Sequence, residues 1–168
     1  AEVPIEIEGL RLTPIPVDHP VPTFGFLIED GRSALVWSSD TGPTKRLWEV
    51  ANAAAELRGV WVDVSFENAL QPIADVSGHL TPQTLAAQLK QLEADVPVAL
   101  HHLKPPSIAR IRDEVAALGQ SRLGFLERRG DGLGLRHVSR FAEETGLSVA
   151  RRQRLIGALE SFGAACRQ

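Results

Sequence analysis

The chain has 168 residues, of which 43 % are hydrophobic and 23 % charged, a balance typical of one soluble globular domain. Its formal net charge of −3 argues against general nucleic-acid binding, which depends on a basic surface that neutralises phosphates. The single cysteine, Cys166, excludes an internal disulfide framework and fits a reducing compartment. No apolar run approaches the ~18 residues that a membrane span needs, so we expect no membrane association and a cytoplasmic location.

The first 38 residues predict antiparallel strands. Apolar and polar residues alternate over 5–15, which indicates one or two half-buried strands. A proline-rich stretch then keeps the segment around Asp18-His19 extended, because proline fixes its own φ and disfavours a helix at the preceding residue. Residues 24–28 and 33–38 predict a hairpin, because the turn signal Asp30-Gly31 separates them.

Strands and helices alternate in the next part of the chain. Apolar stripes predict helices over 44–57, 82–92 and 107–118, and apolar runs predict strands over 60–65, 96–100 and 123–126. This order is typical of a parallel sheet with right-handed crossovers. Asp40, Ser65 and His102 would then follow three successive strands and share the edge of the sheet where ligands usually collect.

The character of the sequence changes beyond Gly130. A glycine-rich joint over 131–134 precedes residues 138–162, which predict two helices broken near 146–148. We therefore divide the chain into a unit over 1–129 and a helical extension over 130–168.

Imidazole and carboxylate groups gather in the predicted loops near this edge of the sheet. Four of the five histidines lie there, together with Asp40. Neutral imidazole and carboxylate are ligands that suit Zn²⁺ and related metals. The alternative is that the histidines are structural and that Asp40 only caps the helix that follows it. Spacing alone does not decide between the two.

Five short motifs nevertheless follow one another in a specific order. They are Val17-Asp18-His19-Pro20-Val21-Pro22-Thr23-Phe24-Gly25-Phe26, Ser38-Ser39-Asp40-Thr41-Gly42-Pro43, Asp63-Val64-Ser65-Phe66, Ser77-Gly78-His79-Leu80-Thr81-Pro82 and His102-Leu103-Lys104-Pro105. Together they resemble the motifs of the class II cyclic-nucleotide phosphodiesterases. That family has the metallo-β-lactamase fold and is related to the tRNA 3′-processing endonucleases. The resemblance covers roughly residues 5–126.

The resemblance implies a phosphodiesterase that hydrolyses 3′,5′-cyclic nucleotides, cAMP or cGMP, to 5′-monophosphates with two divalent metal ions. Zn²⁺ is the expected metal, with Mn²⁺ or Fe as alternatives. By position, His19 would ligate the first metal, Asp40 would bridge both and His102 would ligate the second. A bridging carboxylate holds two cations ~4 Å apart, where they activate a shared water and clamp the phosphoryl oxygens. His79 would give a proton to the departing ribose 3′ oxygen, and Asp63 would orient His79.

Three other polar residues stay outside this catalytic set. Lys104 and Thr81 could contact phosphate or simply cap a helix. His101 is a weaker candidate than His102, because successive side chains of a strand point to opposite faces.

The family's main metal motif, His-x-His-x-Asp-His, occurs nowhere in the 168 residues. We therefore expect an α/β, metallo-β-lactamase-like (αββα) fold of which this chain supplies the carboxy-terminal half. A missing amino-terminal half, or a partner chain such as a second copy in a homodimer, would supply the other metal ligands. A tRNA-processing nuclease is an alternative, although Asp63 stands where that branch carries glutamate. The other alternative is a non-catalytic fragment or interaction module, which metal content would separate from either enzyme.

Overall fold

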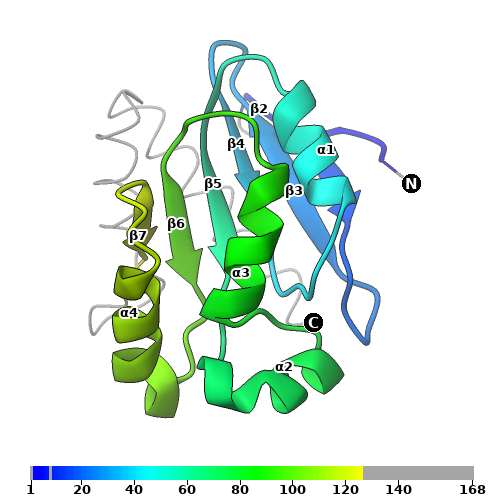
Figure 1. The fold of residues 1–168 in the computed structure, drawn as a ribbon. Helices are drawn as coiled ribbons and strands as arrows, with labels where there is room; N and C mark the ends of the chain where they lie inside the picture. The colour runs from blue at the N-terminus through cyan, green and yellow to red at the C-terminus, as the bar shows by residue number, and fades with distance from the viewer. Residues whose placement is uncertain (1, 8, 127–168) are drawn as a thin grey trace.

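A computed structural model describes residues 2–7 and 9–126 (Figure 1), so the predicted extension over 130–168 lies outside the described residues. The described part forms one sheet with helices. Short 3₁₀ turns accompany them at Asn68–Leu70, Leu89–Gln91 and Pro105–Ser107. The strands and helices in chain order are β1 (Ile5–Ile7), β2 (Leu10–Pro16), β3 (Phe24–Glu29), β4 (Ala34–Trp37), α1 (Arg46–Ala53), β5 (Leu57–Asp63), α2 (Gln71–Ser77), α3 (Pro82–Gln88), β6 (Val98–His101), α4 (Ile108–Ala117) and β7 (Leu123–Phe125).

The seven strands lie in the sheet in the same order as in the chain. Strands β1 to β4 pair antiparallel, whereas β4, β5, β6 and β7 pair parallel. The hairpin between β3 and β4 turns at Asp30, whose Oδ1 accepts hydrogen bonds from the backbone N–H groups of Arg32 and Ser33 at 2.9 and 2.8 Å. Both the antiparallel opening and the alternating parallel part were predicted, and the α/β class is confirmed.

Apolar side chains cover both faces of the sheet. Helices α1, α3 and α4 lie on one face (Figure 1) and share a core with it. In β5, Val60 and Val62 belong to this core, whereas Trp61 belongs to a second cluster on the other face, as the strand alternation requires. No helix in the described part of the chain is both long and apolar enough to cross a bilayer.

Two local predictions were wrong. The helix predicted over 44–57 ends at Ala53, and β5 begins at Leu57, so Gly59 lies inside a strand instead of ending a helix. The parallel pairing of Leu57 with Ala34 overrides the helical periodicity there. Helix α2 was not predicted, because it buries only Ala74 and therefore shows no apolar stripe.

The carboxyl ends of β4, β5 and β6 meet at one edge of the sheet, the lower edge in Figure 1, where α2 also lies. Backbone hydrogen bonds tie the loops there together. The N–H of Ser65 donates to the carbonyl of Leu80 at 3.0 Å, and the N–H of Lys104 donates to the carbonyl of Ser65 at 3.1 Å. The segments after β5, α2 and β6 are thus fixed to one another before any functional side chain is considered.

Candidate metal-binding and catalytic site

The structure brings all five predicted site residues together at this edge, which we call the site rim. Asp63 is the last residue of β5, and the others lie in loops. His19 follows β2, Asp40 follows β4, His79 lies between α2 and α3, and His102 follows β6. Asp40 is no helix cap, because Lys45 holds the N-cap position of α1.

Glycines allow two of these loops to pack closely. Gly78 ends α2 in the left-handed region, with a φ of +69°. A Cβ at this position would collide with Pro20 Cδ and come within 3.1 Å of His19 Cα. On the other side, the N–H of Gly42 donates to the carbonyl of Asp18 at 2.7 Å. The His19 loop is therefore held between the Asp40 loop and the His79 loop.

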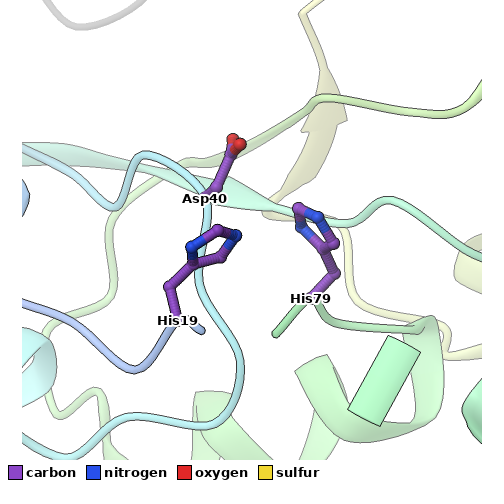
Figure 2. A group of neighbouring side chains, drawn as sticks. All are labelled: His19, Asp40 and His79. Atoms are coloured by element: carbon purple, nitrogen blue, oxygen red, sulfur yellow. The ribbon is translucent and has the colours of Figure 1, made fainter. Parts of the chain in front are cut away.

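His19, Asp40 and His79 lie around one point of the rim (Figure 2), and one potential ligand atom from each lies within 4.8 Å of the others. Nδ1 of His19 lies 3.1 Å from the Thr23 hydroxyl, which donates to the carbonyl of Val21 at 2.9 Å. The backbone N–H of Val21 donates to the same nitrogen at 3.4 Å. The loop thus orients the ring through Nδ1, and Nε2 is the nitrogen that would bind a metal.

Asp63 and His79 form a buried pair. Nδ1 of His79 donates to Oδ2 of Asp63 at 2.7 Å, and Asp63 is fully buried. Burial raises the pKa of Asp63, but hydrogen bonds from His102 and His79 outweigh this effect and bring the pKa to about 2. Asp63 is therefore ionised and fixes the hydrogen of His79 on Nδ1, which leaves Nε2 as the reactive nitrogen.

His102 is held through both of its ring nitrogens. Nδ1 donates to Oδ1 of Asp40 at 2.9 Å, a hydrogen bond that lowers the pKa of Asp40. The same bond, with a weaker one to Asp63, raises the pKa of His102 to about 9. Nε2 lies 2.9 Å from Nζ of Lys104.

The structure offers two groups of possible metal ligands at the rim. The predicted second-metal ligand, His102, has both nitrogens engaged within the chain, and its backbone φ is +64°. A second group of possible ligands, Asp63, His79 and His102, is already joined by hydrogen bonds. The first group, His19 and Asp40 with His79 beside them, suits Zn²⁺. The role of His102 as a ligand of a second metal stays a prediction.

Sequence reasoning gave no role to Ser65, which is fully buried at the centre of the site. Its hydroxyl donates to Oδ1 of Asp63 at 2.7 Å and lies 3.3 Å and 3.2 Å from Nδ1 of His79 and of His102. The available signal was its position two residues after Asp63, which places both side chains on one side of an extended backbone.

The structure also shows the surroundings of two residues that the sequence analysis left outside the catalytic set. Thr81 is the N-cap of α3 in a capping box with Thr84, and it is fully buried. His101 points away from the rim as predicted, because its Nε2 accepts a hydrogen bond from Nε1 of Trp37 at 3.1 Å. Burial lowers the pKa of His101 to about 4, which agrees with this neutral, accepting ring.

The first part of the chain matches a known protein family. The family model described as Beta-lactamase superfamily domain matches residues 1–102. No curated protein sequence matches the chain.

Solved structures share the fold. The metallo-beta-lactamase fold protein YhfI from Bacillus subtilis is 17 % identical with a TM-score of 0.61, over 77 % of this chain and 52 % of that one. Zn²⁺-bound PqqB from Methylobacterium extorquens is 20 % identical with a TM-score of 0.55, over 79 % of this chain and 52 % of that one. The short form of human tRNase Z is 19 % identical with a TM-score of 0.51, over 61 % of this chain and 39 % of that one.

The chain thus spans about half the length of these similar structures, or less. The identities are low and show the common fold alone. The family match covers more than half of the 168 residues. With the sheet topology and the rim of imidazole and carboxylate groups in place, the chain belongs to the beta-lactamase superfamily and has the metallo-β-lactamase fold.

Proposed function

We propose that this rim belongs to a metal-dependent phosphodiesterase that hydrolyses 3′,5′-cyclic nucleotides, cAMP or cGMP, to 5′-monophosphates. The observation that carries the proposal is the 2.7 Å bond between Asp63 and His79, beside the metal donors His19 and Asp40. Phosphodiester hydrolysis needs both parts, a bound cation and a proton for the leaving oxygen. The resemblance of five motifs to the class II family supports the cyclic-nucleotide substrate.

The metal would bind at His19 and Asp40. A divalent ion there supplies Lewis-acid activation of the phosphoryl group and of water. Zn²⁺ suits these donors, and Mn²⁺ or Fe are the alternatives. We propose that an amino-terminal half or a partner chain, including a second copy of this chain, supplies further ligands, because the His-x-His-x-Asp-His motif is not among these residues.

His79 is the proposed proton donor. Its Nδ1 is committed to Asp63, which orients the ring, so proton transfer would take place at Nε2. His79 is only 7 % exposed, which favours transfer to a bound substrate over exchange with bulk water. His102 meanwhile fixes the carboxylate of Asp40 through its 2.9 Å hydrogen bond.

The test is hydrolysis of cAMP and cGMP by the chain loaded with Zn²⁺ or Mn²⁺, with identification of the product. We expect 5′-monophosphate, no turnover in Asp40→Ala, and a rate lower by roughly 10²- to 10⁴-fold in His79→Gln. His101→Gln is the matched control, because His101 is an imidazole on the opposite face of the sheet. Equal rates in the wild type and Asp40→Ala would refute the proposal. Cleavage of a tRNA 3′ extension in place of cyclic nucleotides would refute the substrate.

A further inference from the structure

Lys104 lies at the site rim, and its side chain caps no helix. It occupies the N-cap position of the 3₁₀ turn Pro105–Ser107, but its side chain makes no capping hydrogen bond. Its backbone is anchored instead, because its N–H donates to the carbonyl of Ser65 and its own carbonyl accepts from the N–H of Ser107 at 2.9 Å. The side chain therefore extends from a fixed backbone, and its Nζ lies 2.9 Å from Nε2 of His102.

The charge of Lys104 has no anionic partner in the described part of the chain. Lys45, by comparison, pairs with Glu49 at 3.2 Å. The partner of Lys104 is a ring nitrogen, and the next group is the aromatic ring of Phe66, whose centroid lies 6.0 Å from Nζ. An ammonium group forms strong, charge-assisted hydrogen bonds with an anionic oxygen, which a ring nitrogen does not offer. An anion brought to this rim would therefore displace His102 from Lys104.

The position of Lys104 relative to His79 indicates which anion fits. Phe66 contacts both residues, with its ring centroid 5.8 Å from that of His79. The rings of His79 and His102 are 5.1 Å apart. Lys104 is thus separated from the proposed proton donor by one side chain. A phosphate group that presents its leaving oxygen to His79 would have other oxygens to present to a cation on that side.

We propose that Lys104 is a substrate-binding residue whose ammonium group moves from Nε2 of His102 to a non-bridging phosphoryl oxygen of the phosphodiester. This inference rests on the proposed function and adds the residue that recognises the anion. The same contact persists on the monophosphate product, because the product keeps non-bridging oxygens. Lys104 therefore contributes to affinity in both the substrate and the product complex, and its loss raises KM more than it lowers kcat.

Two ligands that differ only in the phosphate group can distinguish recognition of the anion from recognition of the nucleoside. We would measure the binding of adenosine 5′-monophosphate and of adenosine to the Zn²⁺-loaded chain by calorimetry, for the wild type, Lys104→Met and the control Lys90→Met. Loss of one charged hydrogen bond predicts about 10- to 100-fold weaker binding of the monophosphate to Lys104→Met. Binding of adenosine should be unchanged, Lys90→Met should match the wild type, and Lys104→Arg should recover most of the affinity.

The outcomes distinguish this inference from the proposed function. A wild-type chain that neither binds the monophosphate nor hydrolyses cAMP would refute the proposed function, and the inference with it. A wild type that binds the monophosphate only as tightly as Lys104→Met does would refute the inference alone. So would a fall in kcat with unchanged KM, which would mean that Lys104 only orients His102. Thermal melting verifies folding, and if Lys104→Met does not fold, Lys104→Gln takes its place.

Discussion

Replacement of Gly78 by alanine tests how the His19 loop and the His79 loop are held together. Gly78 has a φ of +69°, and a Cβ there would collide with Pro20 Cδ. A left-handed conformation costs a residue with a Cβ about 1–2 kcal/mol. Displacement of Pro20 by an overpacked atom adds about 1–3 kcal/mol. We expect Gly78→Ala to lower the free energy of unfolding by about 2–5 kcal/mol.

Gly119 provides the matched control. It also follows a helix in the left-handed region, with a φ of +64°, but a Cβ added there would meet no other part of the chain within 4 Å. Gly119→Ala should therefore lose only the conformational part, about 1–2 kcal/mol. Urea titration of both variants measures the difference, and Zn²⁺ binding should weaken in Gly78→Ala alone. Equal losses of stability in the two variants would show that the loops are not packed as described.

Three further predictions concern protonation, hydrogen bonding and metal. His101 has a folded pKa of about 4, below its ordinary 6.5, so its contribution to stability is complete above pH 6.5. Up to about 3 kcal/mol of this stability is lost as the pH falls to 4, because the unfolded state binds the proton first. Urea titrations at several pH values should show this loss in the wild type but not in His101→Gln. The same dependence of stability on pH in both proteins would contradict the prediction. Ser65→Ala leaves Oδ1 of Asp63 without its 2.7 Å donor. We expect a loss of about 1–3 kcal/mol, which Ser65→Thr recovers, and equal unfolding midpoints would count against this role. Zn²⁺ at about 100 times its dissociation constant should stabilise the wild type by about 2.7 kcal/mol, reversibly with chelator; the same gain in Asp40→Ala would place the metal elsewhere.

Local patterns were enough to predict most of the fold. The turn at Asp30-Gly31, the cap at Thr81 and the apolar stripes have short-range causes, so the hairpin and helices α3 and α4 were recognised. The order of strands and helices then placed Asp40 and His102 at one edge of the sheet, where they form a 2.9 Å contact.

The rest depends on contacts between distant segments. The start of β5 is set by its pairing with β4, and α2 buries too little apolar surface to be visible as a pattern. The engagement of His102 by both Asp40 and Lys104 arises only when the loops are folded together. The strand order also placed Ser65 at this edge, but its contacts with three side chains depend on how the loops fold together.

The most direct test of the account is metal content per chain, measured after Zn²⁺ loading and removal of free metal, with cAMP hydrolysis assayed on the same sample. We predict that the wild type retains Zn²⁺ and hydrolyses cAMP, and that Asp40→Ala loses both properties while His101→Gln keeps both. Zn²⁺ binding or cAMP hydrolysis that persists in Asp40→Ala at the wild-type level would contradict the account.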